Sequence, residues 1–238
     1  MRRITPKPRH GGPISGDQAS QTRDRIVAYA LKAFNEIGVA NVTTTGLCAG
    51  LDMSPGHFYY YFRGKEAVVQ HLFDRFERDM QAQLRGRLGG ALSGERLSER
   101  LSERLLNVLD CVWEYRFLYR DMNRLIASSR TLEQGFKELV DQSMRALNAV
   151  LCPDRSEHQS GQHLMQRETA CRCAAIVATY WLSFQFLQNA RQLNDRNVMA
   201  RSVHAARDQI LALLQPFLRD RQTMPAGQRS YIDILEQQ

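Results

Sequence analysis

The sequence predicts an all-α fold of about nine helices, and three observations support this prediction. Apolar residues recur at spacings of three and four along most of the chain, as they do on one face of a helix. No segment shows sustained alternation of apolar and polar residues, the pattern of a half-buried strand. The run from Glu95 to Leu105 repeats every four residues, which aligns Leu97, Leu101 and Leu105 beside rows of glutamate and arginine. With 238 residues and 43% hydrophobic content, the chain can bury a substantial core.

Composition divides the chain into four predicted segments. The N-terminal residues combine arginine and lysine with proline and glycine, a mixture that cannot bury a core. Four glycines between residues 86 and 94 mark a break between two helical domains. The predicted segments are a flexible basic arm at 1–20, a first helical domain at 21–85, a second helical domain at 86–218 and a C-terminal tail at 219–238.

The first domain opens with a predicted helix at about Thr22–Ile37 that ends at Gly38, a suitable C-cap. Its apolar face carries Ile26, Ala30, Phe34 and Ile37. Thr43 or Thr44 can cap a short second helix, whose free N–H groups offer a seat for phosphate. Leu47 and Leu51, four residues apart, give this second helix an apolar face.

A tight turn and a third helix follow. Asp52 suits the turn because its short polar side chain tolerates a left-handed backbone. Ser54 can cap the next helix, with Pro55 at its first position. This helix runs to about Phe62, and its apolar face carries Phe58 and Phe62. Two short helices joined by a tight turn are typical of a helix-turn-helix DNA reader.

The remaining elements are also predicted as helices. Gly64 stops the third helix, and Lys65 opens a fourth that extends to near Arg85 with apolar positions Val68, Val69, Leu72, Phe73 and Phe76. Pro153 ends one later helix, and Pro216 is a candidate bend in the last. The later helices are expected at 95–113, at about 117–126, at 131–151, at 162–192 and at 196–218, with a polar loop at 152–162.

Charge and cysteine usage restrict the function classes. The formal net charge of +7 and pI near 9.4 favour an acidic partner such as nucleic acid. No apolar run is long enough for a membrane span, and no export signal is recognisable, so five reduced cysteines and a cytoplasmic location are expected. Cys171 and Cys173 point apart on a helix, and His158 and His163 have no third ligand nearby, so neither a metal nor a cofactor is expected. No catalytic motif is recognisable.

These residues resemble a known family. The segment Thr22 to Ile26, the positions Ala30, Leu31, Phe34 and Gly38, and the motif ending in Tyr59, Phe62 and Lys65 resemble the N-terminal domain of the tetracycline-repressor (TetR) family of bacterial regulators. The resemblance covers roughly residues 21–80. Cys48 replaces a usual alanine, and Leu51 to Met53 replace a usual Ala-Gly-Val, which concerns the geometry of the turn. More loosely, the Ser-Pro-Gly and Gly-Lys-Glu segments are similar to pseudomonad TetR regulators of polyhydroxyalkanoate genes.

Two sets of side chains are expected to contact double-stranded DNA. Phosphate contacts fix the register of a protein on the duplex, and base contacts specify the sequence, so the two sets should respond differently to mutation. The expected phosphate contacts are Thr43, Thr44, Tyr59 and Lys65. The expected base-reading residues are Ser54, Pro55, Gly56, His57 and Tyr60.

The resemblance also implies a homodimer and a small-molecule inducer. The last two long helices would pair with their symmetry mates, and Ala174 and Ala178 are expected in that close-packed interface. A pseudo-palindromic operator fits such two-fold symmetry. The inducer would lie between helices of the second domain, and apolar lining favours an apolar or acyl molecule. Expected lining residues are Trp113, Tyr115, Phe117, Tyr119, Met122, Tyr180, Trp181 and Phe184, with Cys111, Asn123 or Gln185 adding polarity.

The sequence therefore predicts a homodimeric DNA-binding regulator, a repressor released from its operator by a small ligand. Three alternatives stay open. The same fold can serve an activator, because the position of the operator decides the sign. A helical module that binds protein, or DNA without sequence preference, would use the motif differently. An all-α enzyme with an unrecognised site is the third alternative.

Overall fold

The structure, a computed structural model, describes residues 16–85, 95–151, 161–189 and 196–223. These residues form ten helices and no strand, which confirms the all-α prediction. The helices are α1 (Gly16–Ile37), α2 (Thr44–Gly50), α3 (Pro55–Tyr61), α4 (Lys65–Leu84), α5 (Glu95–Glu114), α6 (Arg116–Arg120), α7 (Met122–Ser128), α8 (Arg130–Leu151), α9 (Gly161–Asn189) and α10 (Arg196–Thr223).

The chain divides into two compact units between Leu72 and Phe73, inside α4. The first unit holds α1, α2, α3 and the start of α4 around a core of buried aliphatic and aromatic side chains. The expected α1 face is confirmed for Ile26, Ala30 and Phe34, which are buried. The same core includes Leu47, Phe58, Phe62, Val68 and Leu72.

The turn between α2 and α3 forms as its residues predict. Thr43 caps α2, because its Oγ1 accepts a hydrogen bond from the backbone N–H of Gly46 at 3.0 Å. Ser54 caps α3 in the same way, accepting from the N–H of His57 at 3.2 Å. Asp52 takes the left-handed conformation with φ of 51°, as expected for a short polar side chain. The two caps and the left-handed residue therefore define where α2 begins, where the chain turns and where α3 begins.

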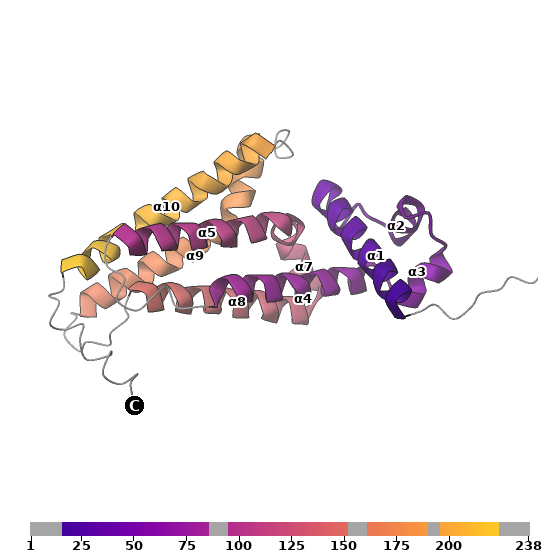
Figure 1. Ribbon diagram of the computed structural model, residues 1–238, viewed down its shortest axis with the longest axis horizontal. Coiled ribbons are helices and arrows are strands. Elements are labelled where there is room, and N and C mark those ends of the chain that lie inside the picture. Colours follow the sequence, from indigo (N-terminus) through magenta and orange to yellow (C-terminus); the bar gives the residue numbers. More distant parts are fainter. Residues whose placement is uncertain (1–15, 86–94, 152–160, 190–195, 224–238) are drawn as a thin grey trace, which may run out of the picture. The chain divides into compact units, whose positions relative to one another are not determined.

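The second unit is a bundle in which α9 packs against α8 and α10, and α10 also packs against α5 (Figure 1). The repeat in α5 buries Leu97, Leu101 and Leu105, as predicted. They share a core cluster with Cys171 and Ala174 of α9 and with three residues of α10, Ile210, Leu214 and Leu218. The spacing of four along α5 is therefore matched by buried positions on α9 and α10.

Several predicted features of the helices differ from the structure. The first helix begins at Gly16 instead of Thr22, so residues 16–20 belong to α1 and not to an arm. Ile37, expected on the buried face, is 54% exposed because it is the last residue of α1, where Gly38 turns the chain away. The helix expected around 117–126 is two helices, since Asp121 ends α6 and precedes α7. This break accounts for ten helices instead of nine.

The last helix is longer than predicted. It continues past Pro216 to Thr223, although proline normally breaks a helix because it removes a backbone donor. Leu214 and Leu218 flank Pro216 and are both buried in the core cluster, so tertiary packing holds the helix through the proline. The glycines of 86–94, Pro153, His158 and most of the predicted arm and tail lie outside the described residues.

Candidate nucleic-acid interface and ligand cavity

α3 presents one apolar face inward and a row of polar aromatic side chains outward. Phe58 is fully buried and its ring lies 6.3 Å from that of Phe62, which is also buried. In contrast, Tyr59 is 54% exposed and Tyr60 is 69% exposed, and His57 is exposed as well. Successive residues on a helix are rotated by about 100°, so burial of Phe58 necessarily turns its neighbours away. The outward face therefore presents the imidazole of His57 and the hydroxyls of Tyr59 and Tyr60, which can form hydrogen bonds.

Ring contacts between neighbours order this outward face. The Tyr61 ring lies 5.4 Å from the His57 ring and 5.0 Å from the Tyr60 ring. The Tyr61 hydroxyl is buried without a hydrogen-bond partner among the described residues, so it serves the packing of its neighbours and is not offered to solvent. Sequence reasoning did not assign this role to Tyr61.

The caps leave some hydrogen-bonding capacity unused. The hydroxyl oxygens of Thr43 and Ser54 accept from the backbone, so each hydroxyl hydrogen can still be donated outward. Pro55 and Gly56 are exposed at the start of α3, and Thr44 is half-buried at the start of α2. All of these expected DNA-contacting residues therefore lie at or near the N-termini of α2 and α3.

Lys65 differs from the other expected contacts. Its side chain is half-buried, and its Nζ donates to the carbonyl of Val39 at 3.0 Å and to that of Val42 at 2.8 Å. These carbonyls belong to the segment between α1 and α2, so Lys65 joins the start of α4 to that segment. An ammonium group has three N–H donors, and one remains for a phosphate. The first role of Lys65 in the structure is thus to position the motif.

Arg23 of α1 is a further residue that the sequence did not single out. Its guanidinium lies 5.0 Å from the centre of the Phe62 ring, and the ring of His71 lies 5.7 Å from the same ring. A cation over an aromatic face is stabilising by about 0.5–1 kcal/mol where exposed. Arg23 and His71 therefore support the C-terminal end of α3.

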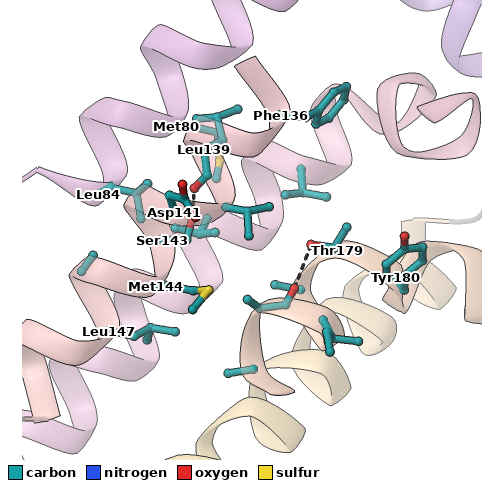
Figure 2. A pocket seen from close by; sticks show the side chains of 18 of the residues that line it. Met80, Leu84, Phe136, Leu139, Asp141, Ser143, Met144, Leu147, Thr179 and Tyr180 are labelled. Carbon is teal, nitrogen blue, oxygen red and sulfur yellow. Dashed lines mark hydrogen bonds between the residues drawn. The ribbon is translucent and has the colours of Figure 1, made fainter. Parts of the chain in front are cut away.

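The second unit contains a cavity of about 570 Å³, within the range of small-molecule sites. Its walls come from α4, α5, α7, α8 and α9, with Tyr119 of α6 and Ile210 of α10. Figure 2 shows Met144 and Leu147 of α8 pointing toward α9, which carries Thr179 and Tyr180. Most of the lining side chains are aliphatic, so the cavity favours an apolar ligand.

The lining agrees only in part with the expected residues. Tyr119, Met122, Asn123 and Tyr180 line the cavity. The other expected residues lie outside the lining. Four are buried in the core of the unit: Phe117, Tyr115, Trp181 and Cys111. The Trp113 ring lies 4.6 Å from the Arg116 guanidinium, the Gln185 side chain accepts a hydrogen bond from Ser202, and Phe184 is exposed. Large aromatic rings were expected in the cavity but mostly serve as core, because their area is best buried between helices.

The polar groups of the lining are largely engaged within the protein. Ser143 and Thr179 each donate to a carbonyl of their own helix at 2.8 Å (Figure 2). Lys137 pairs with Glu133, and Arg172 pairs with Glu168 at 3.1 Å. Arg104, also in the lining, has its pKa lowered by burial. The sequence did not identify these polar residues as cavity lining.

Side chains of α4 connect the cavity to a buried aromatic cluster. Met80 and Leu84 line the cavity, while the Phe76 ring lies 5.4 Å from Tyr115 and 5.9 Å from Tyr119. The Tyr115 hydroxyl donates to Asp79 at 2.6 Å. Burial raises the pKa of Tyr115, and the hydrogen bond to Asp79 raises it further. The phenol therefore stays protonated and keeps α4 attached to the end of α5.

Within the described ranges, no group of three or more His, Cys, Asp or Glu side chains could hold a metal ion. One described segment, Gly161–Gln188, has the length and composition of a membrane span, and 33% of its apolar window is buried. A core helix meets the same criteria, so this single segment is weak support for a membrane location.

The capped turn, the outward aromatic face and the neighbouring helices define a helix-turn-helix DNA-binding protein with a second, cavity-containing helical unit. Comparison with known proteins identifies the family. Residues 26–72 match the model of bacterial regulatory proteins of the tetR family, and residues 68–224 match a model described as bacterial transcriptional repressor. The second match covers more than half of the chain. The chain belongs to the TetR family of bacterial transcriptional regulators, whose members are regulators and not enzymes.

Individual relatives agree with this assignment. The chain is 31% identical over 68 residues to the HTH-type transcriptional regulator UidR of Escherichia coli, covering 29% of this chain and 35% of that protein. It is 31% identical over 55 residues to the probable HTH-type transcriptional regulator YttP of Bacillus subtilis, covering 23% of this chain and 27% of that protein. The match thus spans about a quarter to a third of the length of these relatives.

Solved structures share the fold over nearly the whole chain. A TetR-family transcriptional regulator from Marinobacter aquaeolei superposes with a TM-score of 0.66 at 24% identity, covering 91% of this chain and 97% of that one. Salmonella enterica GusR gives a TM-score of 0.55 at 19% identity, covering 86% and 100%. The similarity to the polyhydroxyalkanoate-gene regulators stays a prediction.

Proposed function

We propose that this DNA-binding regulator is a cytoplasmic homodimeric repressor that leaves a pseudo-palindromic operator when a small apolar or acyl ligand enters the cavity. The observation that carries the proposal is the course of α4. This one helix begins at Lys65, which bonds the carbonyls of Val39 and Val42, and it contributes Met80 and Leu84 to the cavity lining. A ligand that displaces Met80 and Leu84 would act on the helix that holds the segment before α2.

The proposed DNA contacts keep the two sets expected from the sequence. His57, Tyr60, Ser54, Pro55 and Gly56 would read bases, because they lie on the exposed side or the N-terminal end of α3. A recognition helix enters the major groove with its N-terminal residues toward the base edges. Thr43, Thr44, Tyr59 and Lys65 would contact phosphates, with Lys65 using its one remaining N–H.

The dimer proposal rests on exposed apolar side chains of α9. Ile176, Tyr180 and Phe184 are about half exposed and lie four residues apart, and Leu187 follows with 86% exposure. Such a stripe on a helix normally marks an interaction surface. The α10 helix supplies Leu213, which is also exposed. A second copy of the chain, related by a two-fold axis, would cover these residues.

One feature of the dimer expectation is wrong. Ala174 is 1% exposed within a single chain and belongs to the core cluster with Cys171 and Ile210, so it cannot form the centre of an interface between subunits. Ala178 is partly buried against the same cluster. A charge at Ala174 would unfold the subunit before it separated a dimer, because the side chain would be buried without a partner.

Selection of binding sites from a pool of random DNA tests the proposed function. The expected result is one short sequence with two-fold symmetry, protected over both half-sites in a footprint. Steep salt dependence is expected as well: about 6–10 phosphate contacts would weaken binding roughly 10³- to 10⁵-fold between about 50 and 200 mM salt. Binding that selects no sequence would refute a specific regulator and favour a DNA-coating module. Placing the selected site upstream or downstream of a promoter then distinguishes an activator from a repressor.

A further inference from the structure

We propose that the cavity binds an elongated, electrically neutral ligand whose carbonyl or hydroxyl group meets Tyr119 and Asn123, and that it discriminates against a free carboxylate. This inference rests on the proposed function, in which the cavity is the inducer site. The shape of the cavity, the engagement of its cations and the position of its neutral polar groups each support it.

The cavity is long. Its lining on α8 runs from Glu133 to Val150, which at 1.5 Å per residue corresponds to about 25 Å of helix. Between these ends the walls are built mainly from aliphatic side chains. On α5 and α8 they include Leu101, Leu105, Val108, Val112, Val140, Met144 and Leu147. An elongated apolar body would bury more surface here than a compact one.

The cations of the lining already have protein partners. Lys137 pairs with Glu133 and Arg172 pairs with Glu168, and the side chains of both cations are mostly exposed to solvent, at 69% and 64%. Arg104 takes part in an interaction within the protein. The lining also contains the acidic side chain of Asp141. A carboxylate in the cavity would lose its hydration and would have to compete for a cation already engaged, which is unfavourable in an apolar site. A neutral ligand has neither cost.

Two neutral polar groups of the lining lie near one another in the chain. Tyr119 of α6 and Asn123 of α7 are separated by a single helix break at Asp121. Burial raises the pKa of the Tyr119 phenol, so this group stays a neutral donor. Asn123 offers both a donor and an acceptor. Ser143 and Thr179, by contrast, donate to their own helices. The Tyr180 hydroxyl is a further neutral group, but it lies on α9 and its side chain is half exposed, so Tyr119 and Asn123 are the pair best placed to orient a ligand.

Calorimetric titration of the full chain, without DNA, tests the proposal with two probes. Methyl decanoate and decanoate have the same alkyl chain, and only the second carries a charge near pH 7. The ester should bind at least about tenfold more tightly, because the acid must be desolvated. Tyr119→Phe keeps the ring that packs against Phe76 and Phe136, and it should weaken the ester roughly 2- to 12-fold through one lost hydrogen bond. Asn123→Ala should act similarly.

Tyr61→Phe is the matched control. It also removes one buried phenol hydroxyl, but Tyr61 lies in the first unit, outside the cavity lining, so the affinity for the ester should not change. Equal or tighter binding of decanoate, with loss on Arg104→Gln, would overturn the proposal and assign an anionic ligand. Failure of both probes to bind would overturn it as well. Because the titration contains no DNA, its result does not depend on operator binding. If the protein bound the ester but no operator, the proposed function would fail while the ligand preference would stand.

Discussion

At the residue scale, Lys65 shows how structure changes the meaning of a side chain. The sequence suggests a phosphate contact, whereas the structure gives the ammonium two carbonyl partners, Val39 and Val42. From sequence alone, a lysine at the start of a helix next to a DNA-reading motif can be either a phosphate contact or a structural hydrogen-bond donor. Only the fold of the α1–α2 segment, which brings distant carbonyls within reach, separates the two roles.

Replacing Lys65 by Met should therefore lower the free energy of unfolding by about 1–3 kcal/mol, because two carbonyls lose their donor. Lys32→Met is a matched control, since Lys32 is 73% exposed in a 4.0 Å pair with Glu36 and should contribute little. Urea unfolding of both variants measures the difference. If Lys65→Met unfolded like Lys32→Met and only flattened the salt dependence of DNA binding, Lys65 would be a phosphate contact and nothing more.

Cys111 and Cys171 should be inert thiols in the folded protein. Burial raises the pKa of Cys111 to about 12, helped by Asp79 and Glu114, and burial raises that of Cys171 to about 11. Both folded pKa values exceed the unfolded value of about 8.5. Below about pH 8.5 the thiols are protonated in both states, and the protein keeps its full stability. As pH rises above this value the unfolded state ionises first, so the free energy of unfolding falls. Iodoacetamide at about pH 8.5 should label neither residue until denaturant is added. Mass spectrometry that found equal labelling rates with and without denaturant would contradict this.

At the element scale, the sequence predicts what is decided locally. The caps at Thr43 and Ser54 and the left-handed Asp52 depend on neighbouring backbone, and all three form as expected. The cavity lining depends on which helices meet, and no local pattern distinguishes a core leucine from a lining one. For this reason Tyr119 and Tyr180 line the cavity, as expected, whereas Phe117 and Trp181, expected there as well, are core residues.

Gly135 of α8 is a second element-scale feature that only the fold reveals. A Cβ at this position would lie 2.4 Å from the Phe73 ring of α4, so either that ring, which is 1% exposed, or the helix would have to shift. Gly135→Ala should destabilise the protein by about 1–3 kcal/mol through overpacking, partly offset by a gain of about 1 kcal/mol in helix propensity. Gly161→Ala, whose Cβ would meet open space, is the control. Thermal unfolding should show a lower Tm for the first variant only; an unchanged Tm would contradict tight packing of Gly135 against the Phe73 ring.

At the scale of the whole molecule, the exposed stripe on α9 predicts a dimer. Leu187→Lys should weaken association at least about tenfold by placing charge at an apolar contact, and the subunit should stay folded because Leu187 is 86% exposed within one chain. Ile37→Lys, the same kind of change at a position of the first unit that is 54% exposed, should leave the dimer intact. Sedimentation at micromolar concentration measures both. A wild-type mass near 27.3 kDa would reject the dimer outright.

The central claim is that α3 reads base pairs through His57 and Tyr60 while Phe58 and Phe62 hold it in the core. The most direct measurement is binding of variants to the selected operator and to its single-base substitutions, with a melting curve for each variant. His57→Ala and Tyr60→Ala should keep the wild-type Tm and lose about 1–3 kcal/mol of discrimination at particular base pairs. Phe62→Ala should instead lose roughly 3–5 kcal/mol of stability and bind every sequence poorly. If His57→Ala and Tyr60→Ala both kept the wild-type sequence preference, base reading by these side chains would be refuted, and Ser54 and Gly56 would be the next residues to test.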